Sequence, residues 1–292
     1  MQLSTEGGLI MRVLAGILTG ILLLSGISAP AKAAGVKDYT LGDYRVFCFS
    51  EGDRATAFEK ITLPEKSAAL RAQAGANASG MNFFVVASGD ERYLIDAGNA
   101  GKTTAALLEQ AGIRPAQITH ILLTHMHPDH IRGLLTAEGQ AVFPGATLHV
   151  AREEAAYWSD PSQKGGNFER ARQVLAVYGN RLDCFEQNST IGIAASIPAF
   201  GHTPGHTAFR LGGGEKNLVF WGDIVHVPIQ FAEPEIFLSY DVDAPQAIAT
   251  RKRLMAQLAQ SGDFIVGAHI LAPGIGRLEA EGEGYRFVPG ME

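Results

Sequence analysis

The sequence predicts one α+β or mixed α/β domain, with strands and helices layered around a shared core. Three observations support this prediction. Hairpin-like pairs of strands open each half of the chain. Helices stand between the later strands without the regular alternation of a Rossmann fold. The 292 residues contain no internal repeat and no linker that would divide the chain, so residues 34–292 are expected to form a single domain.

In the first half, short apolar or alternating stretches predict strands, and residues 88–91 supply a hairpin-like turn. The predicted strands are Tyr44–Phe49, Phe83–Ala87, Arg92–Ile95, Ile118–Leu123 and Ala146–Val150. The spacing of residues 101–113, closed by Gly112, is typical of an amphipathic helix. Further helices are predicted at residues 129–135, 152–158 and 167–178.

In the second half, the predicted strands are Ile191–Phe200, Ala208–Leu211, Leu218–Trp221 and Phe264–Val266. A helix is predicted at Asp243–Gln260, and a glycine-rich tail follows the last strand.

The first 33 residues differ from the rest. Arg12 precedes an apolar run from Val13 to Ile27, and the small-residue triplet Ala31-Lys32-Ala33 follows it. This pattern predicts a secretory signal peptide at residues 1–33 and a periplasmic or secreted protein. The run is shorter than the roughly 20 residues of a membrane-spanning helix, so no stable membrane insertion is expected after cleavage. Whether translation starts at Met1 or Met11 stays open.

Composition indicates the kind of partner. The formal net charge is −6, and no Lys/Arg cluster occurs, so nucleic acid and anionic membranes are not expected partners. A small molecule is the expected partner. The two cysteines, Cys48 and Cys184, form no CxxC pair; they could form one disulfide or remain free thiols.

Four polar clusters directly follow predicted strands. They are THMHPDHIRG at residues 124–133, GHTPGH at 201–206, GD at 222–223 and GAH at 267–269. Because loops on a rigid scaffold can bring distant side chains together, we expect these clusters to converge. His125 and His127 are two residues apart and so point the same way in an extended segment. Asp129 and His130 follow Pro128 at a helix start. Imidazole and carboxylate ligands suit Zn²⁺ and, less well, Fe, Mn or Co.

These motifs resemble the HxHxDH signature and the later ligand motifs of the metallo-β-lactamase-fold hydrolases. The resemblance implies an αββα sandwich of two mixed sheets with two divalent metal ions at one edge. It assigns His125, His127 and His202 to the first ion, Asp129, His130 and His269 to the second, and Asp223 to both. Asp96 matches a position that hydrogen-bonds a metal ligand, although a turn role is equally open.

The implied chemistry is hydrolysis by an activated hydroxide that bridges the two metals. Asp129 and Asp223 are the expected catalytic carboxylates, with Asp129 steering a proton towards the leaving group. The chain contains no GxSxG motif that would offer a serine nucleophile.

Residues 221–259 and the later PGIG resemble methyl parathion hydrolase and its periplasmic relatives. That subgroup implies a neutral lactone, ester or phosphotriester substrate, an apolar mouth and a homodimer. The candidates for the mouth are Phe83, Phe84, Trp158, Phe231 and Phe237, each of which could instead pack in the core. His226 stands where the acyl-homoserine-lactone lactonases of this fold have a tyrosine, and it could contact the substrate or merely pack.

The alternatives are a β-lactamase, a glyoxalase-II-like thioesterase, an iron-dependent redox enzyme and a non-catalytic zinc-binding protein. A β-lactamase usually has Cys among its ligands or an altered HxHxDH. The predicted export and the lack of a basic cluster argue against a glutathione thioesterase. The complete ligand set argues against a non-catalytic protein. We therefore expect a binuclear zinc hydrolase of the lactone or ester type.

Overall fold

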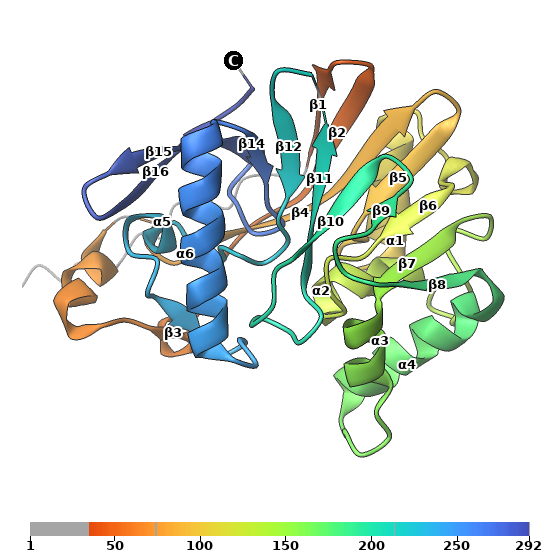
Figure 1. Cartoon of the computed structure of the whole chain (residues 1–292). Helices are drawn as coiled ribbons and strands as arrows, with labels where there is room; N and C mark the ends of the chain where they lie inside the picture. Colours follow the sequence, from red (N-terminus) through yellow and green to blue (C-terminus); the bar gives the residue numbers. More distant parts are fainter. Residues whose placement is uncertain (1–34, 74, 213, 292) are drawn as a thin grey trace, which may run out of the picture.

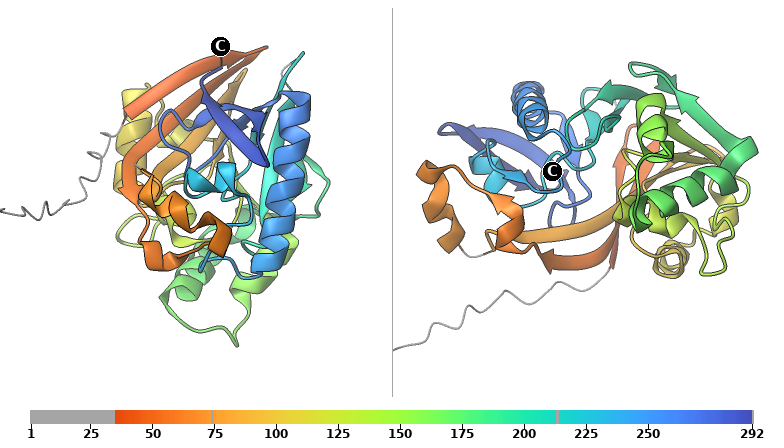
Figure 2. Two further views of the ribbon diagram at one scale, coloured as in Figure 1. Left: turned by 90° about the vertical axis from the view of Figure 1, so that its left-hand side faces the viewer. Right: turned by 90° about the horizontal axis from the view of Figure 1, so that it is seen from below.

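The computed structural model describes residues 35–73, 75–212 and 214–291. Its architecture is two seven-stranded mixed sheets packed face to face, with helices outside them (Figures 1 and 2). This arrangement confirms the predicted α+β class and the αββα sandwich. The predicted signal peptide lies outside the described residues.

The first sheet has the order β1-β2-β4-β5-β6-β7-β8. Antiparallel pairs join the strands from β1 to β5, and parallel pairs join those from β5 to β8. The strands are β1 Gly35–Leu41, β2 Tyr44–Ala55, β4 Ala78–Ser88, β5 Glu91–Ile95, β6 His120–Leu122, β7 Thr147–Ala151 and β8 Leu182–Phe185.

The second sheet has the order β16-β15-β14-β12-β11-β10-β9, with one parallel pair between β12 and β14. The strands are β9 Thr190–Ile191, β10 Ala194–Pro198, β11 Thr207–Gly212, β12 Asn217–Phe220, β14 Phe264–Val266, β15 Ile275–Glu281 and β16 Gly284–Pro289. A separate two-stranded pair joins β3 Ile61–Thr62 to β13 Phe237–Leu238.

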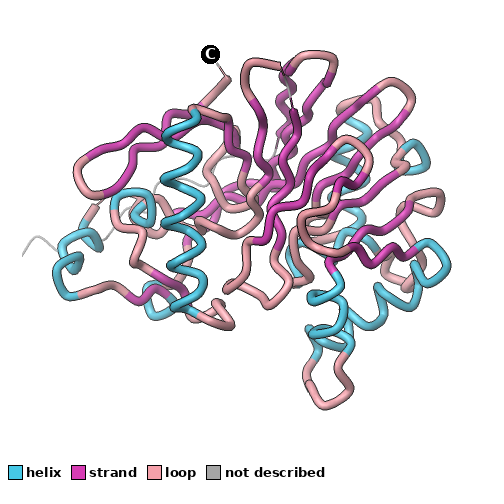
Figure 3. The backbone as a smooth tube through the Cα atoms, viewed as in Figure 1, coloured by secondary structure: helices cyan, strands magenta, loops and turns pink. Residues whose placement is uncertain are grey.

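The α-helices cover the outer faces of both sheets, as the tube view shows (Figure 3). Helices α1 Gly101–Gln110, α2 Pro128–Ile131, α3 Arg152–Ser159 and α4 Gly166–Tyr178 belong to the first half, and α5 Ile229–Ala232 and α6 Ala244–Ser261 to the second. Short 3-10 helices lie at Phe58–Lys60, Glu65–Ala72, Pro115–Gln117, Arg132–Leu134 and Gly179–Arg181. Asp243 caps α6, its carboxylate accepting a hydrogen bond from the Gln246 amide.

Strand β4 illustrates how the layers form. Phe83 and Val85 pack under the outer helices, whereas Phe84 and Val86 pack between the two sheets. Because neighbouring residues of a strand face opposite sides, this run is apolar throughout and buried on both faces. A third core cluster lies between the second sheet and α6, where Leu254 and Met255 pack.

Several elements were not predicted. The strands β1 and β8 were missed, and the glycine-rich tail forms the hairpin of β15 and β16. The strand predicted at Ile191–Phe200 divides into β9 and β10 around Gly192, which has a φ of 55°. The helix predicted at residues 129–135 is the short α2 followed by a 3-10 turn.

Both cysteines are free thiols, Cys48 on β2 and Cys184 on β8, at separated positions in the first sheet. Within the described ranges, no helix combines the length and apolar character needed to cross a membrane.

Candidate metal centre

The four predicted clusters meet at one edge of the sandwich. His125 and His127 follow β6, and His202 lies in the loop between β10 and β11. Asp223 follows β12, and His269 follows β14. Strand ends from both sheets therefore contribute to one group of side chains, as the convergence of loops on a rigid scaffold predicts.

Three imidazoles meet on one side of Asp223. His127 Nδ1 is 2.8 Å from His202 Nε2 and 3.0 Å from His125 Nε2. Asp223 Oδ2 is 3.3 Å from His202 Nε2 and 3.6 Å from His125 Nε2. These four ligand atoms lie within 4.8 Å of one another, which suits a single cation.

A second group lies on the other side of Asp223. Its Oδ1 is 3.2 Å from His130 Nε2, and its Oδ2 is 3.1 Å from His269 Nε2. Asp129 Oδ2 is 3.5 Å from the same nitrogen of His269. The predicted residues of the second site, Asp129, His130 and His269, thus lie together, and Asp223 stands between the two groups.

The other ring nitrogen of four of these histidines is held by a neighbour. His125 Nδ1 lies 3.0 Å from Thr124 Oγ1, and His130 Nδ1 lies 2.8 Å from Asp96 Oδ2. His202 Nδ1 lies 2.8 Å from Asp241 Oδ1, and His269 Nδ1 lies 2.9 Å from the Gly80 carbonyl oxygen. Since a carboxylate or carbonyl only accepts, Nδ1 of the last three donates, and each Nε2 lone pair faces the centre.

Asp96 has the contact that the sequence analysis considered for it. Its carboxylate also accepts hydrogen bonds from the amide and the hydroxyl of Thr124, at 2.9 and 2.8 Å. Asp96 has a φ of 55°, an uncommon conformation for a residue other than glycine. One buried carboxylate therefore orients His130 and the start of the loop that carries His125.

Two atoms test whether a metal fits this centre. His130 Nε2 and Asp223 Oδ1 are buried without a hydrogen-bond partner, although they lie only 3.2 Å apart. A buried polar atom without a partner costs about 1–3 kcal/mol. A cation between them would satisfy both atoms, so the donor set fits divalent metal ions of the kind that histidine and carboxylate bind.

The protein charges favour an ionised Asp223. Burial alone would raise its pKa, but the attraction of His130 and His269 in their protonated forms outweighs burial and holds the pKa well below its usual range. Burial is also the main cause that lowers the pKa of His125 well below its usual value. An unprotonated imidazole and an ionised carboxylate are the forms that bind metal.

Glu154 connects the two ligand loops, a role that no motif in the sequence indicates. Its carboxylate accepts hydrogen bonds from the Met126 amide at 2.8 Å, the Thr203 hydroxyl at 2.7 Å and the Gly205 amide at 3.0 Å. The indole of Trp158 adds a fourth, at 2.6 Å. Met126 lies between His125 and His127, and Thr203 follows His202, so Glu154 fixes the loops of both sheets.

His206 supports the loop of Asp223. Its Nδ1 donates to the Ala199 carbonyl at 2.9 Å, and its Nε2 accepts from the Asp223 amide at 3.1 Å. The loop turns at Gly222, where φ is 57° and an added Cβ would lie 2.5 Å from His206 Nε2, so only glycine fits. His206 therefore supports the loop of Asp223 and is not one of the ligands.

The centre opens into a cavity of about 580 Å³. Its lining includes His127, Asp129, His202, Asp223, His226 and His269, together with Arg54, Ala55, Thr56, Ala57, Ser79, Met81, Asn99, Pro128, Arg132, Asn167 and Tyr240. His226 thus faces the cavity, with its Nε2 3.1 Å from Asp223 Oδ2 and its Nδ1 buried without a partner. Together with Asp223 and His269 it forms a third potential ligand group, which the sequence analysis did not foresee.

None of the five aromatic candidates for an apolar mouth is among the residues that line this cavity. Phe84 packs between the sheets, and Phe231 packs against Trp221 and lines a different cavity. Trp158 is buried beside His127, with ring centroids 5.5 Å apart, and its indole is bonded to Glu154. Phe83 is also buried in the core, and Phe237 lies on β13, outside the lining. Phe83 and Phe84 are buried because strand β4 is covered on both faces, whereas Trp158 and Phe231 are buried on the helices α3 and α5.

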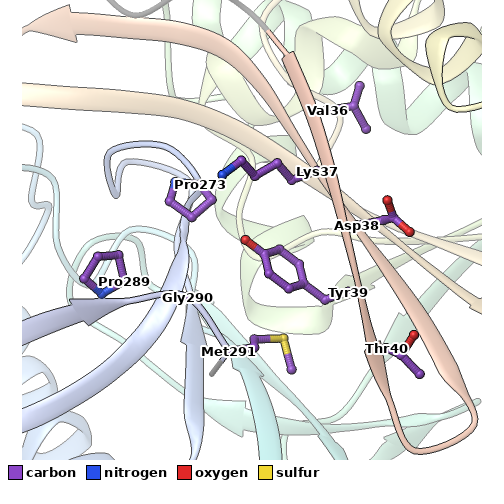
Figure 4. Close-up of a pocket in the computed structure, with 9 residues that line it drawn as sticks. All are labelled: Val36, Lys37, Asp38, Tyr39, Thr40, Pro273, Pro289, Gly290 and Met291. Carbon is purple, nitrogen blue, oxygen red and sulfur yellow. The ribbon is translucent and has the colours of Figure 1, made fainter.

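A larger cavity of about 810 Å³ lies between β1 and the end of the chain (Figure 4). Its lining includes Lys37 and Tyr39 from β1 and Pro289 and Met291 from the C-terminal segment. It contains none of the predicted site residues, so size alone does not locate the chemistry.

Sequence reasoning missed Asp241 and the polar residues of the cavity wall. Asp241 lies in the segment SYDVD, where nothing in a single sequence separates it from neighbouring turn carboxylates. Glu154 stands in the first turn of a helix, where an acidic side chain is common for another reason. Only the folded chain reveals their partners.

Known proteins support the family. The family model of the metallo-beta-lactamase superfamily matches residues 78–269. The crystal structure of the hydrolase AbOPH, in the beta lactamase superfamily, is 31% identical with a TM-score of 0.82, covering 89% of this chain and 99% of that chain. The dizinc quorum-quenching lactonase AidC is 24% identical with a TM-score of 0.80, covering 89% and 98%, which is a likeness of fold alone.

Among curated proteins, an atrochrysone carboxyl ACP thioesterase of Pseudocercospora fijiensis is 28% identical over 145 residues, which are 49% of this chain and 37% of the relative. The first curated relatives are matched over only 22% to 37% of their own length. The family match nevertheless spans both sheets and every motif of the centre. This chain belongs to the metallo-beta-lactamase superfamily, whose members related to it are metal-dependent hydrolases.

Proposed function

We propose that this protein hydrolyses esters or lactones at a binuclear zinc centre, with phosphotriesters as further substrates. The observation that carries the proposal is the two-sided position of Asp223, between one set of three imidazoles and a second set of Asp129, His130 and His269. AidC, a structural relative, is a dizinc lactonase.

His125, His127 and His202 would hold one cation, and Asp129, His130 and His269 the other, with Asp223 shared. When bound, the two cations polarise a carbonyl or phosphoryl oxygen and bring the pKa of a water molecule towards neutrality. Asp96, Asp241 and the Gly80 carbonyl keep three of the imidazoles in one orientation.

Asp129 is the carboxylate best placed to guide a proton. Its side chain is 30% exposed, against 3% for Asp223, and it lines the cavity. An oxygen of Asp129 can therefore take a proton from the attacking water and pass it to the leaving oxygen. His226 lies across the same cavity, where its ring can contact a substrate oxygen.

The test is an assay of the purified protein with its metal content measured. The substrates are a lactone, a 4-nitrophenyl ester, a phosphotriester, a thioester and a cephalosporin. We expect about two equivalents of zinc and turnover of the lactone or the 4-nitrophenyl ester. A protein that binds two metals and cleaves neither contradicts the proposal.

A thioesterase is the second candidate, because a thioesterase is among the relatives, with 28% identity over 145 residues. The thioester in the same panel decides between the two, since a higher kcat/KM for the thioester than for the matched oxygen ester favours this reading. Export to the periplasm and dimerisation are also proposed here; export rests on the sequence pattern of residues 1–33 and dimerisation on the subgroup resemblance alone.

A further inference from the structure

Two arginines from distant parts of the sequence line the cavity of the metal centre. Arg54 lies near the end of β2, and Arg132 follows α2 directly. The chain between them spans 77 residues, so the sequence contains no basic cluster there. The fold nevertheless brings both arginines into the lining of one cavity, together with Asn99 and Asn167.

Arg132 is held in a defined orientation. Its Nη1 donates to Asn99 Oδ1 at 3.0 Å, and the backbone N–H of Asn99 donates to Glu51 Oε2 at 3.0 Å. A guanidinium has five N–H donors in a planar fork. Asn99 accepts from one nitrogen, so the remaining donors of this exposed side chain are available to a ligand.

The two arginines lack a carboxylate in direct contact among the described residues. In the described part of the chain, neither Arg54 nor Arg132 forms an ion pair with a carboxylate. Glu51 is the acidic group beside Arg54, yet burial raises the pKa of Glu51 despite the opposing effects of the Asn99 amide and the Arg54 charge. The other acidic groups of the wall, Asp129 and Asp223, are those assigned to the metals.

We propose that the substrate carries an oxyanion, a carboxylate or a phosphate, at the end remote from the bond that is cleaved, and that Arg54 and Arg132 bind it. The guanidinium fork matches the geometry of both oxyanions. This inference rests on the proposed hydrolase function and replaces the neutral substrate that the sequence resemblance implies.

The experiment uses the zinc-loaded protein and three matched esters. They are 4-nitrophenyl butyrate, the 4-nitrophenyl half-ester of succinic acid, and the 4-nitrophenyl ester of 3-phosphonopropionic acid. The three share a short acyl chain and a leaving group but differ in the terminal group. We expect kcat/KM for at least one anionic ester to exceed that for the butyrate by about 10-fold, which corresponds to one exposed charge-assisted contact of moderate strength. The phosphonate and succinate arms tell the two oxyanions apart.

Variants of the two arginines test whether the arginines or the metals cause the preference for anionic esters. Arg54→Gln with Arg132→Gln should bring kcat/KM for the anionic and neutral esters to within about twofold of each other, whatever the rate for the butyrate itself. The matched control is Arg253→Gln, an exposed arginine on α6 outside the cavity, which should keep the preference. Arg54→Lys with Arg132→Lys should retain part of it, because the charge stays but the fork is lost.

The outcomes are distinguishable. If wild type cleaves neither these esters nor the lactone of the first panel, the proposed function fails. If it cleaves the lactone but none of the three esters, only this inference fails. If it cleaves the butyrate as fast as both anionic esters, only this inference fails. A preference that survives in the double glutamine variant also overturns it, because the attraction then comes from the metals. A preference that weakens as salt rises supports an exposed ionic contact.

Discussion

The floor and the rim of the metal cavity are built differently. The floor, which we define as His125, His130, His202, Asp223 and His269, is between 0% and 7% exposed. The rim, defined as Arg54, Asn99, Arg132, Asn167 and Tyr240, is partly or fully exposed. Every floor histidine has a partner for its outer nitrogen. The rim side chains have few partners, and within the described residues Asn99 and Arg132 are the one pair of rim side chains joined by a hydrogen bond.

This difference separates the parts of the reaction. A floor held by buried hydrogen bonds keeps the metal ligands in one geometry. Hydrolysis requires that geometry whichever substrate is bound. A rim of exposed polar groups selects among substrates without altering that geometry. Changes in the floor should therefore lower turnover of all substrates, and changes in the rim should alter the ranking of substrates.

The largest effect is expected for Asp223→Ala. Loss of the carboxylate shared by the two ligand groups should lower kcat by more than about 100-fold for every substrate. Replacing a residue that only hydrogen-bonds a ligand typically costs about 10- to 100-fold, and loss of a shared ligand should cost more. Circular dichroism should show a folded protein, and metal analysis should show fewer than two equivalents. The exposed Asp43→Ala serves as the control, and near-normal turnover of Asp223→Ala refutes the two-metal assignment.

Glu154→Gln should have the next largest effect, although Glu154 is not itself a ligand. The amide cannot accept from all four donors and presents N–H groups to some of them. We expect metal affinity, measured by competition with a chelator, to fall about 10- to 100-fold. The neighbouring exposed Glu153→Gln is the matched control. Equal affinities in the two variants contradict the role of Glu154 in holding the ligand loops.

Tyr240→Phe tests the rim with a smaller change. Tyr240 is 42% exposed, and its ring lies 6.3 Å from that of His226. Removing one hydroxyl removes at most one hydrogen bond to substrate, so kcat/KM should fall by no more than about 10-fold. The size of the loss should depend on the substrate while the metal content stays unchanged. A uniform loss for all substrates would place Tyr240 with the floor instead.

A histidine pair remote from the cavity should give the smallest effect. His149 Nδ1 donates to Asp183 at 2.8 Å, and its Nε2 accepts from His120 at 3.0 Å. Burial lowers the pKa of His149 although Asp183 opposes this. The unfolded chain, with a pKa of about 6.5, then binds the proton more readily than the folded protein.

The stability contributed by the neutral His149 is thus complete above pH 6.5 and declines as pH falls towards the folded pKa. His149→Gln keeps one donor and one acceptor but does not titrate. In urea unfolding at pH 7.5, 6.5 and 5.5, the variant should lose less stability on acidification than wild type, with kcat unchanged. If the free energy of unfolding falls equally with pH in the two proteins, His149 is not the origin of the pH dependence.

The sequence was sufficient for the elements whose signal is local. Motifs such as THMHPDH have metal-binding residues at a characteristic spacing and stand directly after a predicted strand. The convergence of the His and Asp clusters could therefore be predicted. The strands β1 and β8 could not, because Gly35–Leu41 and Leu182–Phe185 contain charged residues and gain their stability from pairing with neighbouring strands.

The cavity wall could not be predicted for a related reason. Arg54 and Arg132 carry no local pattern, and their place in the lining of one cavity depends on the whole first sheet. The aromatic residues gave the opposite error, because they were predicted to line the cavity and do not. Phe84 and Phe231 suit an apolar mouth by type, but the same property places them in the core, and a single sequence does not distinguish the two positions.

His206 shows how a titratable residue can serve as an inert part. With one ring nitrogen donating to Ala199 and the other accepting from Asp223, the ring has a single usable tautomer. Burial and the charge of His202 lower its pKa to about 3. The imidazole therefore stays neutral and keeps both hydrogen bonds at neutral and mildly acidic pH. The backbone of Asp223 then keeps one position while other histidines of the chain change their charge.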